Sequence, residues 1–272
     1  MYHLIEETVG FIQNRIDGFI PEFGIVLGTG LSNFSSEIEV EYELMYSNIP
    51  NFSISTAEFH SGKLLFGKVN GRTVVAMQGR LHYYEGYSMQ EITFPIRVMK
   101  ELGIKKLFVS NASGSLNPEI KKGDICIIDD HINLISENPL RGYNDDRYGD
   151  RFPDMSMPYD RHMRDQALSI AQRHNIHVHS NVVYVSTSGP NLETRAEYKY
   201  MRIIGGDIVG MSTVSEVIVA NHMSLPVFAI SVVTDEGFHP KLQVFSLQEI
   251  VDVAMSVEPK ITQVLKELIA MQ

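Results

Sequence analysis

Residues 24–32, Gly-Ile-Val-Leu-Gly-Thr-Gly-Leu-Ser, decide the kind of fold that this chain adopts. The apolar run 24–27 predicts a short buried strand, and Gly28 and Gly30 predict a tight turn directly after it. A turn of this kind, with free backbone amides and the hydroxyl of Thr29, suits an anion. It is not a dinucleotide fingerprint, because Asn33 or Phe34 stands where the third glycine of Gly-x-Gly-x-x-Gly belongs.

The segments around this strand predict an α/β fold. Asn70-Gly71 between residues 63–69 and 72–78 is a strong β-hairpin signal. Periodicity predicts helices over 3–17, 91–102, 161–174, 193–204, 213–222 and 247–269, and strands over 106–110, 125–128, 181–186, 207–211 and 227–233. Alternating strands and helices with one antiparallel hairpin indicate a mixed central β-sheet flanked by helices, and no linker divides the single domain that we expect over residues 1–272.

Composition restricts the class of protein. Apolar residues make up 44% of the 272 residues and charged residues 21%, as in an ordinary globular protein. The net charge of −10 argues against a nucleic-acid partner. The one cysteine, Cys126, lies in an apolar strand and cannot form an internal disulfide, which favours a reducing compartment. No stretch approaches the roughly 18 apolar residues of a membrane span, and the start of the chain has no basic leader, so we expect no membrane partner and a cytoplasmic location.

Polar residues gather in turns directly after predicted strands, where open α/β sheets bind ligands. Arg80 and His82 alternate with Leu81, so an extended chain directs both to one face, where they can bind one oxyanion. Ser212 or Thr213 opens a helix, either as its N-cap or facing a phosphate. Glu193 and Asp235 suit a neutral ligand, although Glu193 also fits as an acid that complements a helix dipole and Asp235 as a surface-exposed acid. No His-x-x-x-His or paired cysteines occur, so no metal is expected.

The long segment from Asn138 to Pro158 interrupts the alternation of strands and helices. It carries several Arg and Asp residues among Gly and Pro. A loop of this length in a compact domain is usually functional or part of an interface.

Together these motifs resemble the trimeric purine nucleoside phosphorylases. The resemblance runs in order from about residue 24 to 236. It rests on residues 28–31, 59–62, 78–87, 110–114, 138–142, 149–153, 189–197 and 210–219. It implies a nucleoside phosphorylase-like fold, a homotrimer, and reversible phosphorolysis of purine (deoxy)ribonucleosides to the free purine and (deoxy)ribose 1-phosphate. It also implies a role in purine salvage, with inorganic phosphate as a co-substrate and no cofactor.

The resemblance also implies roles for single residues. The phosphate would be held by Thr29, His60, Arg80, His82, Ser212 and the backbone amide of Ala112. The ribose would contact Tyr84, Met211 and the Phe152 of a neighbouring subunit. The purine would lie among Asn111, Leu192, Glu193, Thr234 and Asp235. His82, Glu193 and Asp235 would take part in catalysis.

Two residues depart from the family pattern. Asp235 stands where the family usually has Asn, and Leu247 aligns with a histidine that often meets the 5′-hydroxyl. Both favour an alternative, a 5′-methylthioadenosine or adenosine phosphorylase. Glu193 favours inosine and guanosine, because its carboxylate accepts the N1–H of a 6-oxopurine. A nicotinamide-dependent oxidoreductase and a non-catalytic nucleoside sensor also stay open.

Overall fold

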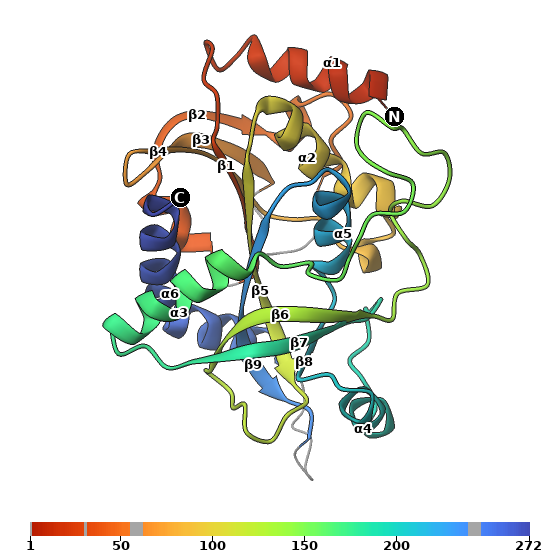
Figure 1. Ribbon diagram of the computed structural model, residues 1–272, viewed down its shortest axis with the longest axis vertical. Coiled ribbons are helices and arrows are strands. Elements are labelled where there is room, and N and C mark those ends of the chain that lie inside the picture. The colour runs from red at the N-terminus through yellow and green to blue at the C-terminus, as the bar shows by residue number, and fades with distance from the viewer. Residues whose placement is uncertain (1, 30–31, 55–61, 239–245) are drawn as a thin grey trace.

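The computed structural model describes residues 2–29, 32–54, 62–238 and 246–272 (Figure 1). Within these ranges, nine strands form one mixed sheet in the order β2-β3-β4-β1-β5-β8-β7-β6-β9. The strands are β1 Phe23–Leu27, β2 Glu39–Met45, β3 Lys63–Val69, β4 Arg72–Gln78, β5 Lys106–Ser115, β6 Ile125–Asn133, β7 Val178–Ser186, β8 Ile208–Gly210 and β9 Val227–Glu236. The α-helices are α1 Tyr2–Gln13, α2 Met89–Leu102, α3 Arg161–Arg173, α4 Arg195–Ile203, α5 Val214–His222 and α6 Leu247–Ala270. The predicted mixed α/β fold is confirmed.

The sheet closes on itself at one end. Strand β5 pairs with β8 and also with β9, which lies at the far end of the strand order. Strands β5, β8, β7, β6 and β9 therefore form a ring, while β1 to β4 extend from it as an open sheet. Local periodicity does not predict this closure, because it depends on pairing between strands far apart in the sequence.

Helices cover both faces of the sheet (Figure 1). On one face α1 packs against α2, and α2 packs against α5; on the other face α3 packs against α6. The two faces enclose separate apolar cores, one with Ile5, Ile12 and Val217, and the other with Ile170 and Leu265. Each fully buried side chain of this size contributes roughly 1.5–3 kcal/mol to folding. No helix within the described ranges combines the length and apolarity that crossing a membrane requires.

Three local expectations have clear outcomes. The hairpin is confirmed, since β3 and β4 pair across Asn70 and Gly71, whose φ angles are 48° and 79°. The first helix ends at Gln13 rather than at residue 17, because the chain turns through Asp17 and Gly18 at positive φ. Strand β2 was not predicted: it lies at the sheet edge, and its side chains are mostly exposed.

The neighbours of β5 change along its length, and this change positions the candidate site. On one side β5 pairs with β1 as far as Val109, and from Gly114 onward it pairs with β8. Residues 110–113 lie between these two partners, so on that side their backbone faces a gap in the sheet. On its other side β5 stays paired with β9 throughout this stretch.

Candidate active site

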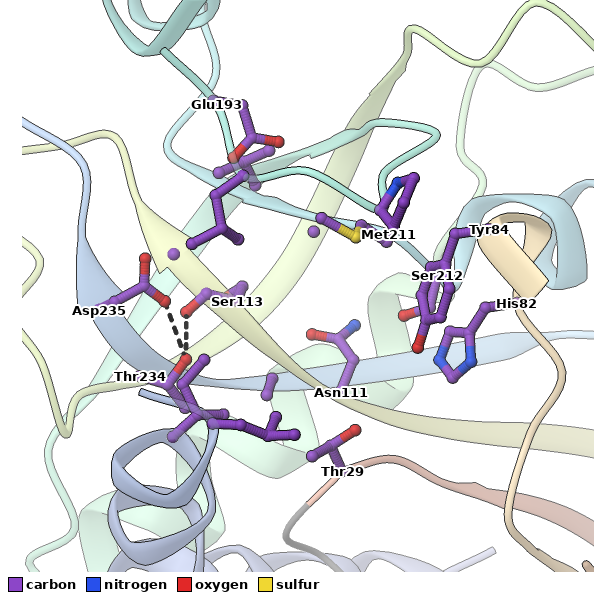
Figure 2. Close-up of a pocket in the computed structure, with 18 of the residues that line it drawn as sticks. Thr29, His82, Tyr84, Asn111, Ser113, Glu193, Met211, Ser212, Thr234 and Asp235 are labelled. Atoms are coloured by element: carbon purple, nitrogen blue, oxygen red, sulfur yellow. Dashed lines mark hydrogen bonds between the residues drawn. The ribbon is translucent and has the colours of Figure 1, made fainter. Parts of the chain in front are cut away.

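A pocket of about 230 Å³ lies at the gap beside β5 (Figure 2). Its walls come from the turn after β1, the segment after β4, strands β5, β8 and β9, residues 190–198 and the start of α6. The lining residues are Thr29, Arg80, His82, Tyr84, Asn111, Ala112, Ser113, Gly114, Pro190, Leu192, Glu193, Tyr198, Val209, Gly210, Met211, Ser212, Thr234, Asp235, Leu247 and Ile250. The fold thus brings together the polar segments that follow separate strands.

Arg80 is held rigidly at one side of the pocket. It is only 1% exposed, and its Nε and Nη2 atoms donate to the Glu216 carboxylate at 3.2 and 2.8 Å. Its Nη1 donates to the Ser110 carbonyl oxygen at 3.0 Å and to the Ser212 hydroxyl at 3.1 Å. Because the Ser212 oxygen accepts from Arg80, the hydroxyl proton of Ser212 remains able to turn toward a bound anion.

Thr213 occupies the N-cap position of helix α5, so this part of the prediction is confirmed. Its φ is 73°, and its side chain makes no capping hydrogen bond. Its Oγ1 instead accepts from Asn111 Nδ2 at 2.8 Å and lies 3.2 Å from Ser212 Oγ. The two hydroxyls are therefore part of a polar network beside the pocket.

His82 is oriented by a carboxylate behind it. Its Nδ1 lies 3.0 Å from Glu85 Oε1, and the His82 backbone N–H donates to the same oxygen at 2.8 Å. The His82 ring stacks on Tyr84 with centroids 4.8 Å apart. The Glu85 carboxylate therefore fixes the orientation of the His82 ring at the wall of the pocket.

The turn after β1 lies close against β5. A Cβ atom on Gly28 would come within 2.5 Å of the Ser110 carbonyl oxygen, so only glycine fits there. The Gly28 N–H donates to the Ser110 hydroxyl at 3.2 Å. This contact holds Thr29 at the wall of the pocket beside Ala112, whose backbone lies in the gap of the sheet.

Two carboxyl groups, Glu193 and Asp235, lie on the side of the pocket away from His82 (Figure 2). Burial raises the pKa of both above their ordinary values, and the charge of Asp235 adds to the rise of the Glu193 pKa. Asp235 Oδ1 accepts from the Thr234 hydroxyl at 3.0 Å, and Glu193 Oε1 accepts from Thr187 at 3.0 Å. Each carboxyl therefore holds a proton more readily than it would in water, and a protonated carboxyl can act as a donor.

The remaining expected residues divide into three groups. Asn111, Tyr84, Met211, Leu192 and Thr234 all line the pocket. The Oδ1 atom of Asn111 is buried and has no hydrogen-bond partner, so it can accept from a ligand donor. Phe152 is 87% exposed and does not line the pocket of its own chain. His60 lies outside the described residues.

Sequence reasoning gave no role to Glu85 or Glu216. The sequence contains a hint of a role for each. Glu85 follows His82 by three residues, and Glu216 is an acid within an otherwise apolar helix segment. A buried glutamate there requires a cationic partner, and Arg80 supplies it. Loss of Arg80 would leave that acid buried and unpaired, at a cost of about 3–5 kcal/mol.

Comparisons with known proteins agree with this geometry. Residues 22–270 match the family model described as the phosphorylase superfamily. The chain is 44% identical over 266 residues to purine nucleoside phosphorylase 1 of Bacillus subtilis (strain 168), covering 98% of this chain and 97% of that protein. It is 47% identical over 239 residues to the purine nucleoside phosphorylase of Mus musculus, covering 86% of this chain and 82% of that protein.

A solved structure agrees at the level of the whole fold. Isoform 2 of the Schistosoma mansoni purine nucleoside phosphorylase, in complex with cytosine and ribose-1-phosphate, superposes with a TM-score of 0.93 at 39% identity, covering 98% of this chain and 96% of that one. A schistosoma purine nucleoside phosphorylase in complex with hypoxanthine superposes with a TM-score of 0.91 at 38% identity, covering 97% of this chain and 95% of that one.

Proposed function

The chain belongs to the phosphorylase superfamily, and we propose that it catalyses the reversible phosphorolysis of purine nucleosides. The observation that carries this proposal is one pocket with two chemically different ends. A hydroxyl, arginine and histidine cluster at one end suits an oxyanion, and two carboxyls of raised pKa at the other suit a purine. The enzyme is a pentosyltransferase that transfers the sugar from the purine to phosphate.

In the reaction the C1′–N9 bond breaks and a bond from C1′ to a phosphate oxygen forms. The electron pair of the broken bond moves into the purine ring, and a proton delivered to N7 neutralises the leaving base. The sugar carries positive charge in the transition state, as in glycoside hydrolysis. An anion held beneath C1′ stabilises that charge and then bonds to it, so phosphate is both the electrostatic partner and the nucleophile.

The phosphate end is assigned to Thr29, His60, Arg80, His82, Ser212 and the backbone amide of Ala112. The Ser212 hydroxyl and the His82 ring contact phosphate oxygens. The Arg80–Glu216 pair holds Ser212 in place, which supports a fixed geometry for the anion. Because Glu216 and Glu85 already hold Arg80 and His82, these two side chains are oriented before phosphate enters.

The other end is assigned to the nucleoside. Tyr84 and Met211 contact the ribose, and Asn111, Leu192, Glu193, Thr234 and Asp235 surround the base. Asp235 acts as the neutral acid that donates to N7, while Thr234 donates to its other oxygen. Gly114 allows this arrangement, because a Cβ there would come within 2.8 Å of Asp235 Oδ2.

We assign inosine and guanosine as the favoured substrates. Glu193, when ionised, accepts from the N1–H of a 6-oxopurine, whereas adenine presents a lone pair at N1. The names of the relatives support this interpretation rather than a methylthioadenosine phosphorylase. A schistosoma purine nucleoside phosphorylase has been solved with hypoxanthine and a Schistosoma mansoni one with adenosine, so 6-aminopurines are expected as weaker substrates.

The working enzyme is assigned as a cytoplasmic homotrimer of purine salvage that uses no cofactor. Phe152 is highly exposed on the loop between β6 and α3, together with Tyr143 and Met157, which are 96% and 74% exposed. Exposed apolar side chains gathered on one loop support a contact with another subunit. The sugar pocket of one chain would then be completed by Phe152 of the next.

A panel of four nucleosides tests the substrate assignment. Purified enzyme in phosphate buffer should cleave inosine and guanosine with a higher kcat/KM than adenosine or methylthioadenosine. A higher kcat/KM for methylthioadenosine or adenosine than for inosine would overturn the role of Glu193. Binding of nucleosides without any cleavage would instead indicate a sensor, and binding of a nicotinamide cofactor an oxidoreductase.

A further inference from the structure

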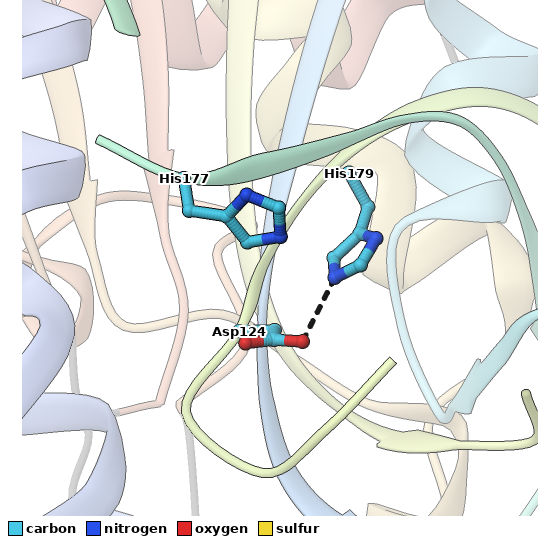
Figure 3. A group of neighbouring side chains, drawn as sticks. All are labelled: Asp124, His177 and His179. Carbon is cyan, nitrogen blue, oxygen red and sulfur yellow. Dashed lines mark hydrogen bonds and ion pairs between the residues drawn. The ribbon is translucent and has the colours of Figure 1, made fainter. Parts of the chain in front are cut away.

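Asp124, His177 and His179 form a cluster outside the pocket (Figure 3). One ligand atom of each residue, two imidazole nitrogens and a carboxylate oxygen, lies within 4.8 Å of the other two. The expectation that the chain has no metal-ligating cluster considered only His-x-x-x-His and paired cysteines. The spacing His177-x-His179 is shorter, and its third member lies 53 residues earlier in the sequence.

Strand pairing accounts for the cluster. Strands β6 and β7 are parallel, with Ile125 opposite Val178 and Cys126 opposite His179. Asp124 directly precedes β6, so it lies beside the start of β7. Residues two apart in extended chain point to the same face, which places His177 and His179 together. Their ring centroids are 4.8 Å apart, and the rings are nearly perpendicular.

The carboxylate is fixed before any ligand arrives. Asp124 Oδ2 accepts from the Lys121 backbone N–H at 2.8 Å and lies 2.8 Å from His179 Nε2. The Asp124 carbonyl oxygen accepts from the Val233 N–H at 2.9 Å, which ties the turn to β9. Hydrogen bonds of this kind orient ligating carboxylates in metal sites.

The charge of the cluster also favours a cation. Within the described part of the chain, His179 is the one ion-pair partner of the Asp124 carboxylate, with no lysine or arginine within 4.0 Å. The Asp124 and His179 side chains are 25% and 21% exposed, so the site is open to solvent but partly shielded from it. With neutral imidazoles the cluster carries one negative charge.

We propose that Asp124, His177 and His179 bind one divalent transition-metal ion, with Zn²⁺ as the best fit. Two imidazole nitrogens and one carboxylate oxygen suit Zn²⁺, Ni²⁺ or Cu²⁺ and not Mg²⁺ or Ca²⁺. A tetrahedral ion with bonds of about 2.0–2.1 Å needs ligand atoms about 3.3 Å apart. For that geometry the exposed His177 side chain would rotate toward Asp124, and the 2.8 Å separation of His179 Nε2 from Asp124 Oδ2 would widen as the ion replaces their hydrogen bond. Three protein ligands leave the fourth position for water.

The ion would link the turn at residues 121–124 to the start of β7. None of its ligands lines the pocket, so the ion is not part of the phosphorolysis machinery. Because it binds the folded state, it should raise the thermal unfolding midpoint as its concentration increases. This gives the site a readout that is independent of activity.

Isothermal titration of ZnCl₂ into the chelator-treated, tag-free protein in a phosphate-free buffer tests the proposal. We expect one Zn²⁺ per chain with a dissociation constant in the micromolar range, and no binding of Mg²⁺ at the same concentrations. His177→Ala should weaken Zn²⁺ binding at least tenfold and remove the thermal shift. His177 is exposed and makes no hydrogen bond within the described part of the chain, so this change should leave the fold intact.

His174→Ala is the matched control. His174 also lies beside a carboxylate, with its Nε2 2.5 Å from Glu267 Oε1, but no second histidine joins that pair. The control should bind Zn²⁺ as the unchanged protein does. Absence of Zn²⁺ binding at millimolar concentration would overturn the proposal. Equal weakening by His174→Ala and His177→Ala would overturn it as well, because it would show unspecific binding to surface histidines.

Discussion

At the scale of single residues, the end of the pocket assigned to the purine contains two carboxyl groups, Glu193 and Asp235, with different proposed roles. In the proposed reaction Glu193 accepts a hydrogen bond from the purine N1–H, whereas Asp235 donates one to N7. Burial raises the pKa of both carboxyls, and an ionised neighbour opposes the ionisation of the other. A single proton shared between them therefore belongs on Asp235 when a 6-oxopurine is bound.

The pH dependence of activity follows from this assignment. The active form of Asp235 is protonated, so kcat/KM for inosine should fall as the pH rises through the raised pKa of Asp235. Asp235→Asn replaces the acid with an amide that donates at every pH. The ratio of kcat/KM for the unchanged enzyme to that for Asp235→Asn should therefore decrease with rising pH. Taking the ratio cancels the titrations of phosphate and inosine, which both enzymes share.

A ratio that stays flat between pH 5 and 9 would contradict the role of Asp235 as an acid.

The folding stability of Asp235→Asn provides a control, because the direction of its change can be worked out. A carboxyl whose pKa is raised by folding holds its proton more tightly in the folded state, so its contribution to stability is lost as the pH rises through that pKa. Asp235→Asn should consequently raise the thermal unfolding midpoint at neutral pH, which separates loss of activity from loss of fold.

At the scale of elements, strand β5 shows what the sequence predicts and what it does not. Its apolar start was predicted from local pattern, as was the hairpin at Asn70-Gly71. The polar segment 110–115 extends the strand well beyond the predicted end, because pairing with β8 and β9 holds it extended. Pairing of distant strands leaves no local periodicity, so the closed ring and the gap beside β5 required the structure.

The same distinction holds for the site. The alternation of Arg80 and His82 is local, so the sequence was sufficient to place both on one face. The Arg80–Glu216 pair and the Asp124–His179 pair join residues 136 and 55 positions apart, and the sequence gives no reason to connect them. Long-range partners of buried or half-buried charges were the main information that sequence reasoning lacked.

The first turn of helix α6 leads to a prediction about recognition of the sugar 5′ position. Leu247 and Ile250 present apolar side chains to the pocket from its first turn. Leu247→His should add a hydrogen bond to the 5′-hydroxyl, worth about 0.5–1.5 kcal/mol, and so raise the preference for inosine over 5′-deoxyinosine about two- to tenfold. Leu247→Met, which conserves volume, is the control and should leave the ratio of the two kcat/KM values unchanged. An unchanged ratio in Leu247→His would show that this turn does not reach the 5′ position.

At the scale of the whole molecule, the proposed role of the exposed Phe152 makes activity depend on assembly. If each pocket takes Phe152 from a neighbour, Phe152→Ala trimers should be weakly active, and so should trimers carrying both Glu193→Ala and Asp235→Ala. Refolding the two proteins together should restore activity, because some pockets then combine an intact base end with an intact Phe152. Burial disfavours the ionised form of both carboxyl groups, so replacing them with alanine should not unfold the chain.

Light scattering should show a trimer for each protein before and after mixing. Activity in the mixture equal to the mean of the two separate proteins would contradict a shared pocket. A fully active monomer would contradict it more directly.

The central claim is that the pocket transfers the sugar to phosphate rather than to water, and the stoichiometry of inosine cleavage tests it most directly. Hypoxanthine is measured by absorbance and ribose 1-phosphate by ³¹P NMR, with phosphate present and with phosphate removed. Transfer to phosphate predicts equal amounts of the two products with phosphate, and no hypoxanthine above the uncatalysed rate without it. Formation of hypoxanthine and free ribose at the same rate in both conditions would contradict the account and identify a hydrolase.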